Sequence, residues 1–341
     1  MIAITGGAGF IGSALVWRLN ALGHKDLVIV DQEAKNAPKW NNIKSHSFDT
    51  YLESSEFIER LEKKEFNGKL SAVFHMGACS STTEMNRAYL KENNSGNSER
   101  IADWAVKNKV YLCYASSAAT YGDGKLGFSD DERLTLQLKP LNPYGQSKLD
   151  FDIWVLKNKL ETQITGFRFF NVYGPNETHK GEMRSMVQKG FEQIRDTGKL
   201  RLFKSYKKEY PDGGQKRDFI YVKDAVDVMI WFYQRSQIKG IYNLGQGVAQ
   251  SWNELAEALF QAMGKPKNIE YIEIPDSIKN QYQYFTEADL KKCLFFANHA
   301  SNYLPIKAVL PLDKEKILNQ LMSVIKSKDL KALKPEWMRG L

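Results

Sequence analysis

The sequence predicts an α/β protein with a Rossmann-type doubly wound parallel sheet and a smaller C-terminal substrate lobe. Three observations lead to this prediction. Short runs rich in β-branched and aromatic residues alternate with longer helical segments in the first half of the chain. A glycine-rich string follows the first run and opens the first helical segment. The 341 residues, of which 43% are apolar, are enough for two domains with a real hydrophobic core.

The predicted strands are short apolar runs. Strands covered by helices on both faces are expected to be continuously apolar rather than alternating, as Leu27-Val28-Ile29-Val30 is. The strands are expected over residues 2–5, 27–30, 72–75, 110–114 and 164–167. Apolar residues at helical spacing predict helices between them over 10–22, 84–106 and 144–160.

Beyond residue 171 the pattern changes. Turn signals such as Pro211-Asp212-Gly213-Gly214 and a charged stretch predict a second lobe. Apolar residues then crowd a predicted helix over 221–234, which indicates that the chain returns to the first lobe. We therefore expect a dinucleotide-binding domain over 1–170 with a returning segment near 219–245, interleaved with a substrate lobe that occupies most of 171–341.

Composition excludes several classes of protein. A charged fraction of 26% with 12% aromatic residues does not fit a collagenous, coiled-coil or disordered chain. The net charge is +8, but the basic tail over 307–341 has few interleaved aromatic residues and is predicted to be a solvated helix face, not a nucleic-acid surface.

Cysteine usage and apolar run lengths indicate the compartment. Cys79, Cys113 and Cys293 are far apart and match no disulfide framework or zinc spacing, so no metal site is predicted. No basic leader precedes the first strand, and no apolar run approaches the about 18–20 residues of a membrane span. The expectation is a cytoplasmic protein without a membrane or nucleic-acid partner.

The string Thr5-Gly6-Gly7-Ala8-Gly9-Phe10-Ile11-Gly12 lies between a predicted strand and a predicted helix. In that context it indicates a dinucleotide site. Gly6 allows a sharp turn, Gly9 lets the backbone approach a pyrophosphate, and Gly12 permits close packing of helix on strand. The helix N-terminus adds unpaired N–H groups for the anion.

The second predicted strand leads to Asp31, whose carboxylate would accept hydrogen bonds from an adenosine ribose and so favours NAD. Gln32, Lys35 and Lys39 follow, and a lysine that reaches a 2′-phosphate would favour NADP. These residues alone leave the choice between NAD and NADP open.

Tyr144 and Lys148 are four residues apart and share one face of a predicted helix. A phenol with an ordinary pKa of about 10 becomes a usable base only if a cation stabilises its phenolate. The YxxxK pattern alone is also typical of a tyrosine packed over a lysine stem. Here it follows the fourth predicted strand and the string over 115–122, which contains Ser116 and Ser117.

Three further features are weaker candidates. His75, at the end of a buried strand, is predicted to pack beside the cofactor rather than act as a base. His179 is predicted to be a polar group of a loop. The loop over 204–217 holds five basic and two acidic residues, which suits either a diphosphate or plain solvation.

The glycine string, the Ser116-Ser117 pair and the YxxxK pattern resemble the extended short-chain dehydrogenase/reductase superfamily of nucleotide-sugar enzymes, over nearly the whole chain. Four more strings, over 75–84, 166–175, 179–181 and 216–219, are similar to its ADP-glyceromanno-heptose 6-epimerase family. The resemblance implies epimerisation at C6 of an ADP-linked heptose, from the D-glycero to the L-glycero form, for lipopolysaccharide core precursors. It also implies tightly bound NADP, with NAD as the alternative, and a homo-oligomer.

Site residues follow from the resemblance one by one. Ser117 would hydrogen-bond the reacting oxygen, Lys148 would support Tyr144, and Tyr144 and Lys180 would be acid/bases on opposite faces of the sugar. The cofactor would contact Gly6, Gly9, Phe10, Ile11, Gly12, Asp31, Gln32, Lys39, Met76, Gly77, Ala78, Cys79, Ser80, Asn93, Lys148 and Val172. The ADP-sugar would contact Ser117, Asn171, Glu182, Lys189, Phe203, Lys204, Ser205, Tyr206, Arg217 and Tyr282.

The chain departs from the family pattern locally. Glu182 and Lys189 stand where the family has a small residue and a histidine, the loop between Phe203 and Arg217 is longer, and Leu52, Glu53 and Ser54 stand where a cofactor-contacting lysine is expected. These changes bear on nucleotide and cofactor preference.

Two other functions are weighed against this one. Another nucleotide-sugar epimerase or dehydratase would share the fold, but a dehydratase usually has an acidic pair where Ala118 and Ala119 stand. A non-catalytic NADP-binding module would not need Ser117, Tyr144 and Lys148 together.

Overall fold

The computed structural model describes residues 1–32, 37–279 and 281–299. Its main element is a seven-stranded sheet in which every neighbouring pair is parallel. In spatial order the strands are β10 (Gly240–Leu244), β6 (Thr165–Phe169), β5 (Tyr111–Ser117), β4 (Ala72–His75), β1 (Ile2–Thr5), β2 (Leu27–Asp31) and β3 (Thr50–Glu53). The order reverses at β1, and crevices at such a switch point are where α/β sheets bind ligands.

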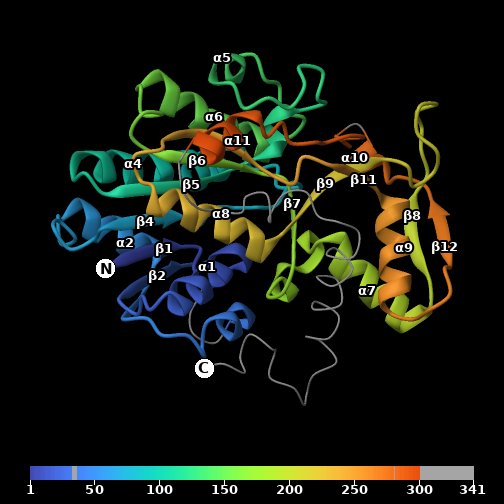
Figure 1. The fold of residues 1–341 in the computed structure, drawn as a ribbon, viewed down its shortest axis with the longest axis horizontal. Helices are drawn as coiled ribbons and strands as arrows, with labels where there is room; N and C mark the ends of the chain where they lie inside the picture. Colours follow the sequence, from blue (N-terminus) through green and yellow to red (C-terminus); the bar gives the residue numbers. More distant parts are fainter. Residues whose placement is uncertain (33–36, 280, 300–341) are drawn as a thin grey trace.

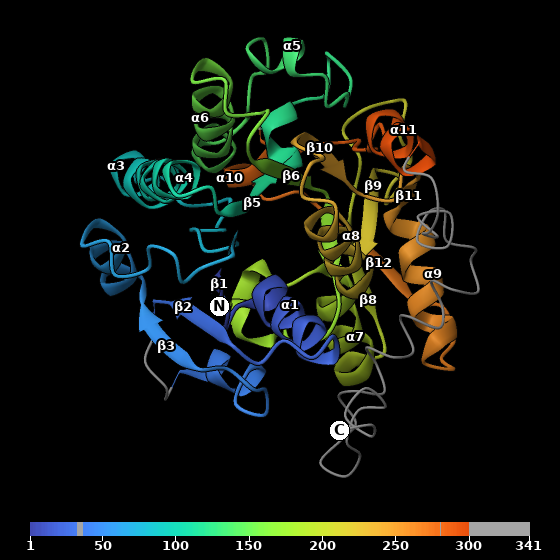
Figure 2. The ribbon, with the colours of Figure 1, turned by 60° about the vertical axis from the view of Figure 1, so that its left-hand side comes forward.

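Helices cover both faces of the sheet (Figures 1 and 2). Alternate residues of β1 separate the two cores: Ile2 and Ile4 pack with α1 (Phe10–Ala21) and α8 (Val222–Gln234), while Ala3 packs on the opposite face. The helices on that opposite face are α2 (Ser54–Glu62), α4 (Asn97–Lys107) and α6 (Pro143–Lys157). This arrangement confirms the predicted doubly wound fold.

The smaller C-terminal part has its own apolar core and lies at the right of Figure 1. A three-stranded sheet contains β11 (Ala249–Ser251), β9 (Lys216–Tyr221) and β7 (Asn171–Tyr173), and a two-stranded sheet contains β12 (Ile269–Ile272) and β8 (Leu200–Phe203). These sheets pack with α7 (Met186–Thr197) and α9 (Trp252–Ala262). The remaining helices are α3 (Arg87–Leu90), α5 (Glu132–Thr135), α10 (Asp276–Lys279) and α11 (Lys291–His299).

All five predicted strands are present, with ends that differ by up to three residues. The sequence did not predict β3, an edge strand in which only Leu52 is buried, because it lacks a continuous apolar run. The helix predicted over 84–106 begins at Arg87, after Asn86 caps it, and contains a π-helical turn over Lys91–Gly96. Such turns are frequent at functional sites.

The chain returns to the main sheet after the second lobe begins, because α8 packs beside α1 and β10 pairs with β6. The predicted domain boundaries stay a prediction, and the basic tail over 307–341 lies outside the described residues. No helix in the described part of the chain is both long and apolar enough to cross a membrane.

One buried ion pair joins several of these elements. Arg168 of β6 and Asp152 of α6 are both 0% exposed, and Arg168 Nε lies 2.9 Å from Asp152 Oδ2. Asp152 also accepts hydrogen bonds from Tyr114 (3.0 Å) and Ser116 (2.9 Å) of β5. The pair therefore sets the position of α6 against β5 and β6.

Removing the charge of Asp152 is expected to destabilise the fold. Asp152→Asn leaves the Arg168 guanidinium buried without its counter-ion, which costs about 3–5 kcal/mol of unfolding free energy. Urea unfolding measures this loss. Lys63→Met, which breaks the exposed pair with Glu59, is the control and is expected to leave the unfolding midpoint in place. Equal midpoints for Asp152→Asn and the wild type would contradict this account.

Candidate active site

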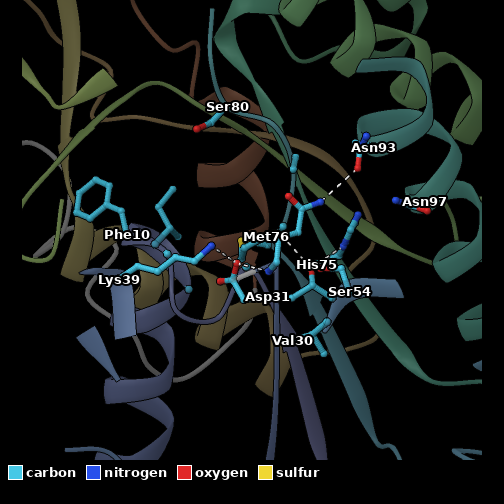
Figure 3. A pocket seen from close by; sticks show the side chains of 18 of the residues that line it. Phe10, Val30, Asp31, Lys39, Ser54, His75, Met76, Ser80, Asn93 and Asn97 are labelled. Carbon is cyan, nitrogen blue, oxygen red and sulfur yellow. Dashed lines mark hydrogen bonds and ion pairs between the residues drawn. The ribbon is translucent and has the colours of Figure 1, made fainter. Parts of the chain in front are cut away.

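A cavity of about 530 Å³ opens at the carboxyl ends of β1, β2 and β4 (Figure 3). The cavity is lined by the glycine string, the end of β2, the 3₁₀ turn Pro38–Asn42, α2, the segment after β4, the π-helical turn, α4 and a loop from the second lobe. They contribute nearly all of the predicted cofactor residues, namely Gly6, Gly9, Phe10, Ile11, Gly12, Asp31, Gln32, Lys39, Met76, Gly77, Ala78, Ser80 and Asn93.

The glycine string has the geometry that the sequence predicts. Gly6 has φ +63°, and a Cβ on it would lie 2.8 Å from Gly77. A Cβ on Gly12 would lie 2.1 Å from the carbonyl oxygen of Gly6, so no side chain fits there. The N-cap of α1 is Gly9, and no side chain caps the helix or places an acid in its first turn. Its N–H groups are thus available to a pyrophosphate, and the residues present fit a dinucleotide.

Asp31 is held by three donors at the cavity wall. Its carboxylate accepts hydrogen bonds from the N–H groups of Ala8 (3.0 Å) and Gln32 (2.8 Å) and from Lys39 Nζ (2.7 Å). Figure 3 shows Lys39 directed at Asp31, so the lysine offsets the carboxylate charge where a ribose would lie. Lys35 lies outside the described residues.

His75 forms part of the cavity floor. Its Nδ1 lies 2.7 Å from Thr5 Oγ1, and its Nε2 lies 2.8 Å from Ser98 Oγ. Burial, aided by the nearby charge of Lys148, lowers the pKa of His75 to about 3. The ring is therefore neutral and fully hydrogen-bonded, which agrees with a packing residue rather than a base.

Ser117, Tyr144 and Lys148 come together between β5 and α6. Pro143 and the Asn142 cap, which accepts from Gly145 N–H at 2.7 Å, start α6 just before Tyr144. Ser117 lies at the end of β5, near enough to the Tyr144 hydroxyl to act on its pKa. Lys148 Nζ donates to the carbonyl of Ala115 at 2.9 Å.

Burial shifts the ionisation of both residues on α6. It raises the pKa of Tyr144, and the hydrogen bond from Ser117 opposes that shift. Burial also lowers the pKa of Lys148 to about 8, against the attraction of Asp152 one turn further along the helix. The site thus holds a protonated phenol next to a lysine that titrates close to neutrality.

Lys180 enters the cavity from the loop between β7 and α7. Its Nζ lies 5.4 Å from the centre of the Phe10 ring, within cation–π distance. Burial lowers the pKa of Lys180, and the carboxylate of Glu177 opposes this. The neighbouring His179 ring lies 3.2 Å from Asn42 Nδ2, so it is a bonded polar group of the loop, as predicted.

Several predicted substrate residues form a separate aromatic cluster in the second lobe. The guanidinium of Arg217 lies 5.6 Å from the Trp252 ring and 5.1 Å from the Tyr282 ring. It is buried and donates to the carbonyls of Lys216 and Gln283. Phe203 packs against Tyr282 at 5.8 Å, so Phe203, Arg217 and Tyr282 are brought together.

Other predicted substrate residues form ion pairs or hydrogen bonds away from the cavity or lie on nearby strands. Lys189 pairs with Glu182 at 3.0 Å, and Lys204 pairs with Glu273 at 2.7 Å. Tyr206 also contacts Glu273, while Ser205 N–H donates to Asp212 at 2.7 Å. None of Glu182, Lys189, Lys204, Ser205 and Tyr206 lines the cavity described above, and Asn171 and Val172 lie on β7.

Sequence reasoning missed three buried polar residues that support the site. Asn42 Nδ2 donates to the carbonyls of Ala8 (2.9 Å) and Asn176 (3.3 Å). Asn94 accepts from Cys79 N–H (2.8 Å) and donates to its carbonyl (3.0 Å) and to Ser147 Oγ (2.9 Å). Glu177 is the third. The pair Asn93-Asn94 inside a predicted helix was the one signal in the sequence for any of these three residues, because the groups that they bond are distant in sequence.

The buried His75 is expected to make stability depend on pH. Its folded pKa of about 3 lies below its ordinary value of 6.5, so the unfolded chain binds a proton between these pH values that the folded protein does not. The unfolding free energy should therefore fall as pH drops below about 6.5, by up to about 1.4 kcal/mol per pH unit from this ring.

Urea unfolding of wild type and His75→Gln between pH 7 and about pH 4 measures this contribution. The variant should lose stability less steeply than the wild type as pH falls. His24→Gln, at an exposed position, is the matched control and should follow the wild-type slope. Parallel slopes for His75→Gln and the wild type would show that the ring is not buried neutral.

Comparisons with known proteins agree with this geometry. Residues 2–245 match the NAD dependent epimerase/dehydratase family. ADP-L-glycero-D-manno-heptose-6-epimerase of Nitratidesulfovibrio vulgaris is 47% identical over 86% of this chain and 90% of that protein, and the enzyme of the same name from Fusobacterium nucleatum is 45% identical over the same shares.

A solved structure adds to these relatives. The crystal structure of the Helicobacter pylori ADP-L-glycero-D-manno-heptose-6-epimerase is 26% identical, with a TM-score of 0.76 over 96% of each chain. The cavity, the Ser117–Tyr144–Lys148 group and these similarities lead to one conclusion. The chain belongs to the NAD dependent epimerase/dehydratase family and, within it, to the ADP-L-glycero-D-manno-heptose-6-epimerases.

Proposed function

We propose that the chain converts ADP-D-glycero-D-manno-heptose to ADP-L-glycero-D-manno-heptose by inverting C6, in the synthesis of lipopolysaccharide core precursors. The observation that carries the proposal is the assembly of Ser117, Tyr144 and Lys148 near the cavity lined by the glycine string, which Lys180 enters from a different loop. Identities of 40–47% to enzymes of this name support the substrate class. Incubating the purified chain with the D-glycero substrate and resolving the two products by NMR tests it.

The chemistry explains why two proton-transfer groups are needed. A C–H bond next to only a hydroxyl is not acidic, so proton removal from carbon cannot invert C6. When bound, the nicotinamide would take a hydride from C6 and return it to the opposite face of the resulting ketone. The C6 oxygen then points in a different direction in each half-reaction, so a proton must be handled on two sides of the sugar.

The environments of Tyr144 and Lys180 suit opposite roles. Burial raises the pKa of Tyr144 and so favours a phenol that gives up its proton to the C6 oxygen. Burial lowers the pKa of Lys180 and so makes a neutral amine accessible to accept one. Pairs of groups whose pKa values are pushed apart are typical acid/base pairs. Ser117 would orient the oxygen, and the Lys148 ammonium would stabilise the phenolate.

For the cofactor, the family is NAD(P)-dependent, and we propose NADP. Lys39 supports this choice because its ammonium lines the cavity and offsets the charge of Asp31 beside the expected ribose. Arg217, within its aromatic cluster, is proposed to hold the diphosphate of the ADP-sugar. Assembly into a homo-oligomer stays a prediction.

The two-base arrangement predicts the behaviour of two variants. Tyr144→Phe and Lys180→Met are each expected to lower kcat for epimerisation by about 10²- to 10⁴-fold, because each removes one general acid/base. Both variants should retain bound dinucleotide, measured by mass spectrometry. Lys63→Met serves as the surface control.

An ADP-sugar with an aldehyde at C6 tests the two proton-transfer groups separately. Its dismutation, in which one aldehyde is oxidised while another is reduced, takes place at one face of the carbon and so needs only one base. Either variant should keep part of this dismutation while losing epimerisation. A raised KM with an unchanged kcat in Lys180→Met would instead show that Lys180 only binds phosphate.

The cofactor proposal predicts a selective effect of Lys39→Ala. Loss of a charge-assisted contact to the 2′-phosphate should weaken NADP binding about 10- to 100-fold and leave NAD less affected. Titration of protein stripped of its dinucleotide with each cofactor measures the two affinities. Equal losses for NADP and NAD would limit Lys39 to its pairing with Asp31.

A further inference from the structure

Glu177 is a carboxylate that the proposed chemistry does not use, yet it is almost fully buried, with 1% of its surface exposed. It lies between β7 and α7, three residues before Lys180. Its Oε1 accepts hydrogen bonds from Gly174 N–H (3.2 Å) and Ser185 Oγ (2.7 Å), and its Oε2 accepts from Ser185 N–H (2.5 Å). Burial raises the pKa of Glu177, and the hydrogen bonds from Ser185 and Gly174 and the charge of Lys180 oppose that rise.

These bonds close the loop that carries Lys180. Gly174 lies at the start of this loop and Ser185 at its end, so the Glu177 carboxylate bridges the two ends. Ser185 is also the N-cap of α7, because its Oγ accepts from Gln188 N–H at 3.2 Å. Lys180 N–H in turn donates to the carbonyl of Glu177 at 3.0 Å. The backbone under Lys180 is therefore tied to the first turn of a long helix.

The same loop is also tied to the cofactor side of the cavity. Asn42 bonds the carbonyls of Ala8 and Asn176 and contacts His179. Asn176 Nδ2 reaches Ser13 Oγ of α1 at 3.2 Å. The loop that carries Lys180 is therefore anchored on both sides.

Glu177 also supplies negative charge near the Lys180 ammonium. Burial lowers the pKa of Lys180, and Glu177 is the carboxylate that opposes this shift. The loop also carries His179, Glu182 and Arg184; Glu182 pairs with Lys189 and Arg184 pairs with Glu192. Lys39 and Asp31 lie close enough to act on His179. Lys39 and Asp31 pair with each other at 2.7 Å, so their fields largely cancel at Lys180.

We propose that Glu177 is a positioning residue for Lys180, which closes the loop beneath it and keeps a negative carboxylate in the same loop as its ammonium. The inference rests on the proposed role of Lys180 as an acid/base. It explains why an acid is buried here without an ion-pair partner within bonding distance in the described structure. Replacing it should change the pH at which Lys180 works, which a purely structural residue would not do.

The test is the pH dependence of Lys180 itself. With two proton-transfer groups, kcat is expected to have a bell-shaped dependence on pH, in which Lys180 sets one limb. In Glu177→Gln, loss of the negative charge should lower the pKa of Lys180. The limb that Lys180 sets should therefore move to lower pH by about one unit, while the other limb stays. Ser185→Ala is the matched control: it removes one donor to Glu177 but keeps the carboxylate, so both limbs should stay.

A second readout does not depend on activity. Acylation of Lys180 across a pH series, followed by mass spectrometry on protein with its dinucleotide bound, gives the titration midpoint of the amine. The midpoint should fall in Glu177→Gln and remain in Ser185→Ala. Glu177→Asp, which withdraws the carboxylate by one methylene, should give a smaller fall and replaces Glu177→Gln if circular dichroism shows that variant to be unfolded.

The outcomes separate this inference from the proposed function. If the Glu177 variants keep the wild-type acylation midpoint of Lys180 and the wild-type pH profile of kcat, the positioning role is overturned, even if Lys180→Met abolishes epimerisation. Full epimerisation by Lys180→Met would overturn the two-base function, while labelling would still report whether Glu177 tunes the amine.

Discussion

The buried pair between Arg168 and Asp152 is the interaction on which the arrangement of Ser117, Tyr144 and Lys148 depends. It joins the strand next to β5 to the helix that carries Tyr144 and Lys148, and Asp152 also binds Ser116, the neighbour of Ser117. A buried pair of charges tolerates little displacement, because separating the partners leaves each without solvent or counter-ion. Ser117 and Tyr144 are thus held near each other by the contacts of Asp152, which lies about two turns from Tyr144 on α6 and bonds the residue next to Ser117.

Burial determines the chemistry of the site as much as position does. Removal from water favours the neutral forms of acids and bases alike, so the pKa of Tyr144 rises while those of Lys148 and Lys180 fall. The local charges then adjust each group: Asp152 acts on Lys148, and Glu177 acts on Lys180. Burial therefore favours a protonated phenol at Tyr144 and a more readily neutral amine at Lys180.

The two lobes contribute to one cavity through loops rather than through their cores. The glycine string and the end of β2 come from the main sheet, whereas His179 and Lys180 come from the segment after β7. Asn42 and Asn176 connect these parts by bonds to backbone and hydroxyl groups. A loop attached at both ends can present a lysine to a bound ligand without a large loss of conformational entropy on binding.

Local sequence patterns determined the fold class, the five strands of the first half and the dinucleotide loop, because strand and helix periodicities and glycine requirements act over a few neighbouring residues. The resemblance to the extended short-chain dehydrogenase/reductase superfamily added the expectation that Ser117 acts with Tyr144 and Lys148. The tertiary structure alone decided the edge strand β3, the pairing of Lys39 with Asp31, and the supporting roles of Asn42, Asn94 and Glu177. Contacts of this kind join residues that are distant in sequence or whose side chains could equally face water, so only the folded chain determines which donor meets which acceptor.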